Sequence, residues 1–290
     1  MDAIGIIGLG LVGTALARRL MAAGFAVHGF DLERQALAAL QAAGGSPEPS
    51  AASVGTRCTV VVLAVFDTGQ VRSVLDSLLV PRHAVRTVID CSTGEPEALG
   101  ELAASLRSRG IDFIEGPLSG SSQQIAAGQA TQLLGGDEEA ITRARPVLEA
   151  IAPQRVHVGG AGMAAKAKLA TNLVLGLNRA VLAEGMAFAE SLGIAPDAFL
   201  QLVLATPARS AAAEAKGPLM VSGHFEPQSR IRQHLKDVGL MLEAARASGQ
   251  PLPLSETHAG LMRDAVAAGD GDLDNAAIVR QWRRVRRPST

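Results

Sequence analysis

The sequence predicts an α/β domain built on a doubly wound parallel sheet, followed by an all-α domain. Three observations support this fold class. Apolar segments typical of buried strands alternate with helical segments over residues 3–158. The first of these strands runs directly into glycines spaced G-x-G-x-x-G. Beyond Gly162 only helical patterns follow, so we expect the first domain at residues 1–160 and the second at residues 161–290.

The glycine spacing lies at residues 8–13, where an apolar strand gives way to a helix. Gly8 can take a tight turn, Gly10 leaves room for a diphosphate beside the backbone, and Gly13 lets the helix pack against the strand. The N–H groups that open the helix would then face an anion. The spacing alone is equally compatible with a structural glycine turn. The cofactor contacts expected in this stretch are Gly8, Leu9, Gly10, Leu11, Val12 and Gly13.

A carboxylate follows the second predicted strand. Helical spacing over residues 14–23 and a strand at residues 26–30 complete one βαβ unit. Asp31 then stands 18 residues after Gly13, close to the spacing of about 20 at which a carboxylate binds an adenosine ribose. We therefore expect NAD, because a 2′-phosphate would lie beside a like charge; nearby Arg34 leaves NADP possible. The structural alternative for Asp31 is a solvated acid at the end of a strand.

The alternation continues through the rest of the first domain. We expect strands at residues 57–65, 87–91, 111–114, 132–134 and 155–158, and helices at residues 70–79, 96–110 and 138–151. A doubly wound sheet binds its ligand at the carboxyl ends of its strands. Residues 8–13, 65–67 and 92–94 should therefore line one crevice.

The second domain opens with a long helical pattern over residues 163–192, rich in alanine and leucine and free of proline. Further helices are predicted at residues 195–204, 208–220, 233–248 and 254–268. A helix of about 30 residues spans about 45 Å and generally needs burial against more than a small domain. This length suggests a homodimer.

Composition excludes several classes of function. The formal net charge is −1, so nucleic acid is not an expected partner, and we interpret the arginines within residues 281–290 as a solvated tail. Cys58 and Cys91 form no C-x-x-C pair, and no histidine spacing is typical of a metal site, so no metal is expected. The glycine motif begins within ten residues of Met1, and no apolar run reaches about 18 residues. We expect a cytoplasmic protein with no membrane contact.

The residues that carry proton chemistry are restricted by the absence of tyrosine, which excludes a Tyr-x-x-x-Lys pair. Lys168 and Asn172 lie four residues apart on one face of the long helix, where an ammonium and a carboxamide can converge on one oxygen. A partly desolvated lysine has a lowered pKa and can exchange a hydroxyl proton during hydride transfer. A lysine that extends its head group to solvent is the structural alternative, and a His–Asp relay also stays open.

Five motifs together resemble the β-hydroxyacid dehydrogenase family, which includes 3-hydroxyisobutyrate dehydrogenase and tartronate semialdehyde reductase. They occur in the family's order and at its intervals over most of the chain. They are the glycine turn at residues 5–13, V-I-D-C-S-T at 88–93, E-G-P-L-S-G at 115–120, G-x-x-x-x-x-K-L-x-x-N at 162–172 and L-K-D-V at 235–238. The resemblance implies a Rossmann domain followed by a helical dimerising domain, and thus a homodimer or homotetramer.

The resemblance also implies roles for individual residues. Lys168 would be the general acid and base, and Asn172 would orient it or the substrate. Ser119 and Gly120 would bind the substrate carboxylate, and Lys236 would supply positive charge near substrate and nicotinamide. The further cofactor contacts would be Val65, Phe66 and Thr93.

Two departures from the family pattern concern the substrate. The usual D-A-P-V-S-G-G is E-G-P-L-S-G-S here, so Ser121 adds a side chain beside the carboxylate site and joins the expected substrate contacts. The usual N-N pair after the lysine is Thr171-Asn172. With Gln123 and Gln124 next along the chain, these changes favour a substrate with extra hydroxyl groups.

These observations lead to an NAD-dependent dehydrogenase of a small 3-hydroxy acid, or a reductase of its semialdehyde, as the expected function. An imine reductase is the alternative among enzymes, and Lys168 argues against it because such relatives tend to lack the lysine. A dinucleotide-binding protein without turnover is the alternative outside enzymes.

Overall fold

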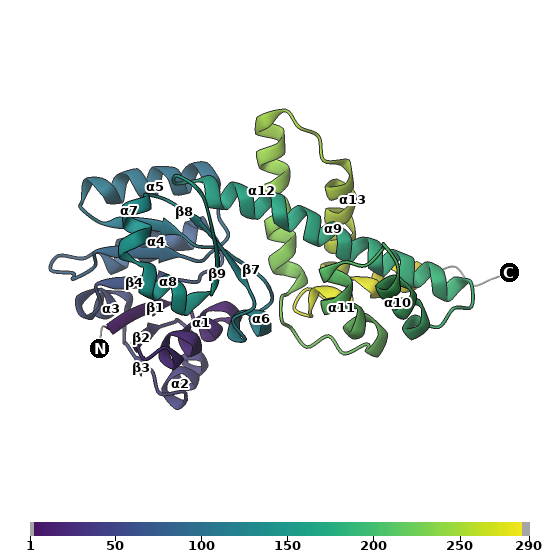
Figure 1. Cartoon of the computed structure of the whole chain (residues 1–290), viewed down its shortest axis with the longest axis horizontal. Helices are drawn as coiled ribbons and strands as arrows, with labels where there is room; N and C mark the ends of the chain where they lie inside the picture. Colours follow the sequence, from purple (N-terminus) through teal and green to yellow (C-terminus); the bar gives the residue numbers. More distant parts are fainter. Residues whose placement is uncertain (1–2, 286–290) are drawn as a thin grey trace. The chain divides into compact units, whose positions relative to one another are not determined.

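The computed structural model describes residues 3–285, and the chain divides into two compact units, Met1–Lys168 and Leu169–Thr290. Figure 1 labels most of the elements of both units. The strands are β1 (Ala3–Ile7), β2 (Ala26–Phe30), β3 (Ser46–Pro47), β4 (Val60–Leu63), β5 (Thr87–Asp90), β6 (Asp112–Glu115), β7 (Leu118–Ser119), β8 (Thr131–Gly135) and β9 (Gln154–Gly159).

The helices of the first unit alternate with these strands. They are α1 (Leu11–Ala22), α2 (Arg34–Ala42), α3 (Ala51–Arg57), α4 (Thr68–Leu78), α5 (Pro96–Ser108), α6 (Ser122–Ala126), α7 (Glu138–Arg143) and α8 (Arg145–Ile151). Helix α9 (Met163–Ser191) begins in the first unit and continues into the second. The second unit then contains α10 (Pro196–Ala205), α11 (Ala211–Ser222), α12 (Ile231–Ser248), α13 (Pro253–Ala267), a 3₁₀ helix (Asn275–Ile278) and α14 (Val279–Val285).

The sheet has the strand order β3-β2-β1-β4-β5-β6-β8-β7, with β9 paired to β8. Strands β1 to β6 pair in parallel in the order 3-2-1-4-5-6, the arrangement of a doubly wound dinucleotide-binding domain. The predicted fold class is therefore confirmed. Strand β8 differs, because it runs antiparallel to β6 and β7. The 11 residues between β7 and β8 are too few for the crossover of a dozen or more that a parallel pair needs.

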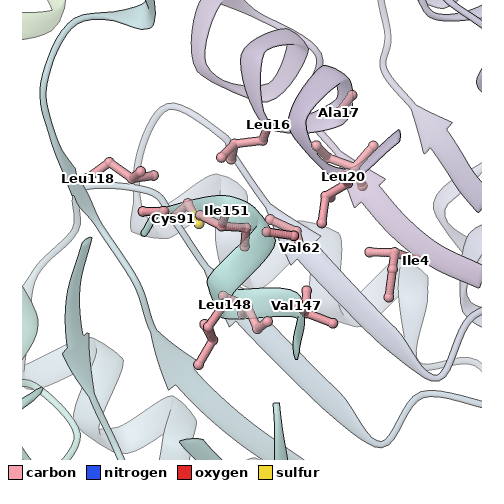
Figure 2. Close-up of a cluster of buried hydrophobic side chains, with 14 of the residues drawn as sticks. Ile4, Leu16, Ala17, Leu20, Val62, Cys91, Leu118, Val147, Leu148 and Ile151 are labelled. Carbon is pink, nitrogen blue, oxygen red and sulfur yellow. The ribbon is translucent and has the colours of Figure 1, made fainter. Parts of the chain in front are cut away.

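Helices cover both faces of the sheet. Side chains alternate along each strand, so each central strand contributes to both apolar clusters. Val62 of β4 joins the cluster under α1 and α8, which Figure 2 shows with Leu16, Leu20 and Leu148. Val61 and Leu63, its neighbours in the strand, join the cluster on the other face with residues of α3, α4 and α5. This double burial explains why the central strands read as continuous apolar runs in the sequence.

Two predicted segments are wrong in detail. The helix predicted at residues 138–151 is broken into α7 and α8, because Pro146 has no N–H to donate and its ring clashes with the preceding turn. The strand predicted at residues 57–65 begins only at Val60, since Arg57 ends α3. Ser50 starts α3 by accepting the N–H of Ser53, a cap that the sequence analysis did not recognise.

The second unit is helical, as predicted, and its core collects apolar side chains from α9 to α14. Within residues 3–285, no helix is long and apolar enough to cross a membrane. The arginine-rich end of the chain was expected to be solvated, which is wrong for residues 281–283 and agrees with the exposure of Arg284 and Val285. Gln281 is buried there, and Arg283 and Arg284 pair with Glu190 and Asp270. Residues 286–290 lie outside the described part of the chain.

Charged groups are buried inside the second unit. Lys216 of α11 pairs with the fully buried Asp274 at 2.8 Å. His234 of α12 and His258 of α13 lie with ring centroids 5.4 Å apart. A Cβ on Gly176 of α9 would lie 2.3 Å from the Nε2 of His234, so only glycine fits there. Burial, with a smaller contribution from the charge of Arg179, lowers the pKa of His258 to about 4.

The protein should lose stability as the pH falls from about 6.5 to about 4. In this range the unfolded chain binds a proton at His258 and the folded chain does not, because the folded-state pKa is lowered. The effect is at most about 3 kcal/mol. The variant His258→Gln, which takes up no proton, should show a flatter dependence of Tm on pH in thermal melts.

His224→Gln is the matched control, because His224 is an exposed histidine of the same unit. Its melting curve should follow the wild type at each pH. Equal pH dependence in His258→Gln and the wild type would contradict the assignment.

Candidate active site

The three glycines of the N-terminal motif meet different surroundings. Gly8 has φ +87°, and a Cβ there would lie 2.3 Å from the carbonyl oxygen of Ala64. A Cβ on Gly13 would lie 1.9 Å from the carbonyl oxygen of Gly8, so α1 packs directly on the turn. A Cβ on Gly10 would meet nothing within 4 Å. The turn is thus tightly packed on its inner side and open at Gly10.

This turn opens onto a cavity of about 520 Å³ at the carboxyl ends of β1, β2 and β4. Its lining includes Gly8, Gly10, Asp31, Val65, Phe66 and Gln70. No side chain caps α1 at Gly10, and its first turn has no acidic residue, so the positive end of its dipole is not neutralised locally. Five of the predicted positions, Gly8, Gly10, Asp31, Val65 and Phe66, therefore share one cavity that suits the adenosine and diphosphate of a dinucleotide. Leu9, Leu11, Val12 and Gly13 do not line it.

Asp31 is held by backbone donors at the rim of this cavity. Its Oδ2 accepts the N–H of Leu9 at 2.6 Å, and its Oδ1 accepts the N–H of Glu33 at 2.9 Å. The carboxylate is therefore fixed beside the glycine turn, where each oxygen keeps a further lone pair for a ribose hydroxyl.

The next strand ends at a small hydrogen-bonded corner. The N–H of Val65 donates to the Oγ of Ser92 at 3.1 Å, and the N–H of Ser92 donates to the Oδ1 of Asp90 at 2.9 Å. Thr93 is half-buried one residue further on and does not line the 520 Å³ cavity. Ser92 thus links the ends of β4 and β5, and none of the residues 92–94, which were expected in the same crevice as the glycine turn, lines this cavity.

The predicted carboxylate-binding segment follows β6. Ser119 is half-buried in β7, and Gly120 has φ +154° with the Cβ of Ala130 only 2.9 Å from where its own would lie. Ser121 starts α6 with a reciprocal cap. Its Oγ accepts the N–H of Gln124, and the Oε1 of Gln124 accepts the N–H of Ser121. The side chain of Gln124 is therefore engaged in the helix start, while the Ser121 hydroxyl keeps its proton to donate.

Lys168 is buried, with 6% of its surface exposed, and its Nζ donates to the carbonyl oxygen of Leu118 at 2.7 Å. Leu118, the residue directly before Ser119, thus binds the amine of Lys168. Lys166 points elsewhere, since it is exposed and pairs with Glu97 at 3.6 Å. Of the two neighbouring lysines, only Lys168 is withdrawn from water.

Glu115 is a buried residue of this region to which the sequence analysis gave no role. Its carboxylate accepts the N–H of Gly162 and, at 2.8 Å, the N–H of Ala165, at the start of α9. Burial raises its pKa, an effect that the two N–H donors oppose. The E-G-P-L-S-G motif contained the residue, but no local pattern indicated its partners.

In the second unit, Asn172 and Lys236 share a partner. The Nδ2 of Asn172 donates to the Oδ2 of Asp237 at 3.3 Å, and the Nζ of Lys236 lies 2.9 Å from Oδ1 of the same carboxylate. Asp237 was also missed, although it stands within the L-K-D-V motif. In the described part of the chain, no group of three or more His, Cys, Asp or Glu side chains is arranged to hold a metal.

Two family models cover nearly the whole chain. The NAD binding domain of 6-phosphogluconate dehydrogenase matches residues 3–160, and the NAD-binding domain of NADP-dependent 3-hydroxyisobutyrate dehydrogenase matches residues 160–282. An L-threonate dehydrogenase of Cupriavidus necator is 33% identical over 98% of this chain and 97% of its own length.

Solved structures agree with these matches. The crystal structure of 3-hydroxyisobutyrate dehydrogenase from Salmonella typhimurium is 31% identical, with a TM-score of 0.87 over 97% of this chain and 99% of that chain. An imine reductase from Pseudomonas sp. is more distant, at 20% identity and a TM-score of 0.66 over 97% and 99% of the two chains, and shares the fold alone. From its sequence motifs, the order of its strands and these matches, the chain belongs to the β-hydroxyacid dehydrogenase family.

Proposed function

We propose that the chain is an NAD-dependent dehydrogenase that interconverts a small 3-hydroxy acid and its semialdehyde. The observation that supports this most is the burial of Lys168 with its Nζ on the carbonyl of Leu118, directly before Ser119 and Gly120. A proton-transferring amine and the expected carboxylate-binding backbone are thereby joined within the first unit. Residues 1–160 would bind the cofactor, and residues 161–290 would contribute to substrate binding and dimerisation.

In the proposed reaction Lys168, as the neutral amine, removes the hydroxyl proton of the acid while the adjacent carbon loses a hydride. A nicotinamide cofactor held at the Gly8–Gly13 turn and Asp31 would supply the hydride chemistry in both directions. In reduction the ammonium of Lys168 gives its proton to the new alkoxide oxygen. In the first unit, Ser119, Gly120 and Ser121 would donate to the substrate carboxylate. For Asn172 and Lys236, the family resemblance implies an amide donor and a positive charge for the substrate.

The residues at the first cavity fit NAD. The open side of Gly10 leaves space for the diphosphate, and Asp31 is positioned by two backbone donors at the rim. Asp31 would bind the ribose hydroxyls and would disfavour a 2′-phosphate by charge repulsion. NAD is therefore the proposed cofactor, with NADP as the weaker alternative.

An acid with additional hydroxyl groups is the proposed substrate class. Ser121 replaces the glycine of the usual family motif and keeps a hydroxyl proton to donate beside Gly120. The relative from Cupriavidus necator is an L-threonate dehydrogenase, which agrees with this polarity.

The assay that tests the function is NADH absorbance with a panel of acids and their semialdehydes. The panel contains threonate, glycerate, serine and 3-hydroxyisobutyrate, each with NAD and with NADP, and cyclic imines as the comparison. Turnover of an acid with NAD would support the proposal. Turnover of imines alone would favour an imine reductase, and NADH binding without any turnover would favour a binding protein.

Lys168→Ala should lower kcat by about 10²- to 10⁴-fold, because general acid and base catalysis is worth this much. The dissociation constant of NADH should stay near the wild-type value, measured by fluorescence titration. Lys166→Ala is the matched control, since it removes an exposed lysine from the same helical turn. Wild-type turnover in Lys168→Ala would refute the assigned role.

Gly10→Ala and Gly13→Ala should separate cofactor binding from stability. The methyl group of Gly10→Ala enters open space in the free protein, so Tm should hold while NADH affinity falls by about tenfold or more. The methyl group of Gly13→Ala lies 1.9 Å from the Gly8 carbonyl oxygen, so Tm should fall by several degrees or more. Unchanged NADH affinity in Gly10→Ala would argue against a diphosphate at this turn.

A homodimer is proposed through the outer face of α9. Val174, Val181 and Phe188 lie seven residues apart along this helix, and 57%, 66% and 63% of their surfaces are exposed. Leu192, four residues after Phe188, is also exposed, at 63%. A stripe of this kind can pack against the same stripe of a second copy, whereas solvated helix faces are usually polar.

Val181→Glu and Phe188→Glu together should shift the protein to a monomer in light scattering at micromolar concentration. Buried charges at a symmetric interface would face their own copies without partners. Glu243→Gln, a change of charge at an exposed residue of α12, serves as control and should leave the mass unchanged. A wild-type mass equal to one chain would refute the dimer, and a mass of four chains would favour the tetramer.

The cytoplasm is the proposed compartment. Both cysteines, Cys58 and Cys91, are free and buried, as is typical of a reducing environment. Fractionation of cells that express the chain would test this location.

A further inference from the structure

One buried carboxylate joins the end of β6 to the start of α9. Glu115 is 1% exposed, and its two oxygens accept the N–H groups of Gly162 and Ala165. The first hydrogen bond of α9 runs from Lys166 N–H to the carbonyl of Gly162. Gly162 therefore directly precedes the first residue of α9, Met163, and Ala165 is the third residue of the helix. Glu115 satisfies two of the donors that every helix leaves without partners at its start.

The charge of Glu115 also has no substitute within the helix. The first turn of α9 contains no acidic residue, and it carries a lysine, Lys166, at the end where positive charge is unfavourable. The exposed Glu97 pairs with that lysine and not with the backbone donors. Glu115 is thus the carboxylate that binds the backbone at the positive end of a 29-residue helix.

The same chain segment holds Lys168. Three residues after Glu115, the carbonyl of Leu118 accepts the Nζ of Lys168, which lies one helical turn beyond Ala165. Pro117 restricts the backbone between these two contacts. The Gly116 carbonyl is fixed in addition by the Nε2 of Gln132 at 3.1 Å. Glu115, the first turns of α9 and Leu118 therefore form a closed ring of contacts, in which a shift of α9 moves Lys168 relative to Leu118.

The charged groups around Glu115 come from two elements. Asp90 of β5 stands opposite Glu115 in the sheet register and is equally buried, and Lys166 approaches from α9. Burial is the main reason that the pKa of Glu115 is raised, and the charge of Asp90 adds to it. A protein loses little folding stability when a carboxyl group whose pKa is raised in the folded state is made neutral. A neutral isostere at this position should therefore fold.

We propose that Glu115 is a positioning residue of the reaction: by holding the backbone N–H groups of Gly162 and Ala165, it sets the position of Lys168 against Leu118, Ser119 and Gly120. The inference rests on the proposed function for its catalytic consequence. Its structural half, the restraint on Lys168, can be measured without any substrate.

Glu115→Gln should lower kcat of semialdehyde reduction by about 10- to 100-fold, because misplacing a catalytic group by about 1 Å costs this much. Reduction is the informative direction, since Lys168 acts there as its protonated form. Tm at neutral pH should stay within a few degrees of the wild type, and the KM for NADH should be nearly unchanged. A loss confined to kcat distinguishes positioning from general destabilisation.

Two further variants control this result. Glu115→Asp keeps the charge but withdraws it by one methylene, so its kcat should fall less than that of Glu115→Gln. Glu97→Gln removes a carboxylate near the same helix start that is exposed and does not bind the backbone, and it should behave as the wild type. Wild-type kcat in both Glu115 variants would overturn the proposal, as would an equal loss in Glu97→Gln.

The activity-independent experiment is acylation of the lysines by acetic anhydride, followed by mass spectrometry of the peptide that contains both. Lys166 is exposed and serves as the internal standard for the buried Lys168. In Glu115→Gln, modification of Lys168 relative to Lys166 should rise severalfold, because the restraint on its helix is weakened. An unchanged ratio would overturn the proposal. If the wild type turns over no acid or semialdehyde, the proposed function fails, and the acylation ratio still decides the role of Glu115.

Discussion

The contact on which the candidate site depends is the carboxylate of Glu115 at the first turn of α9. The first N–H groups of a helix have no acceptor within the helix, and leaving them without one inside a protein costs folding free energy. Glu115 meets two of them from the end of a strand in the middle of the sheet. The sheet therefore determines where the helix begins, and the helix carries Lys168 to the carbonyl of Leu118. The sheet register, the start of the helix and the buried amine of Lys168 are thus joined by direct contacts.

The second unit uses buried charge in another way. The carboxylate of Asp237 binds both Asn172 and Lys236, the two residues proposed to contact the substrate. Asp237 itself has no expected contact with the substrate. Deeper in the same unit, Lys216 pairs with Asp274, while burial keeps His258 neutral. Buried ion pairs contribute little net stability, but they are costly to break. These groups therefore restrict how the helices can repack.

In the loop after β7, the structure changes the interpretation of one residue that the sequence had placed beside the substrate. Gln123 and Gln124 suggested a polar loop beside the substrate. Gln124 instead completes the capping box of α6 with Ser121. The hydroxyl of Ser121 remains available as a donor, so the argument for a polar substrate now depends on this one side chain. The capping pattern was visible in the sequence, since a serine stands three residues before a glutamine ahead of Ile125.

By itself the sequence determined the alternation of strands and helices, the glycine turn, the position of Asp31 and the spacing of Lys168 and Asn172 on one helix. These features depend on residues within one helix or one strand–helix–strand unit, where period, turn chemistry and spacing are informative. Only the tertiary structure decided the partners of the polar side chains. Glu115 and Gly162 are 47 residues apart, Lys168 and Leu118 are 50 apart, and Asn172 and Asp237 are 65 apart. Such pairs depend on strand order and helix packing, which no local pattern contains.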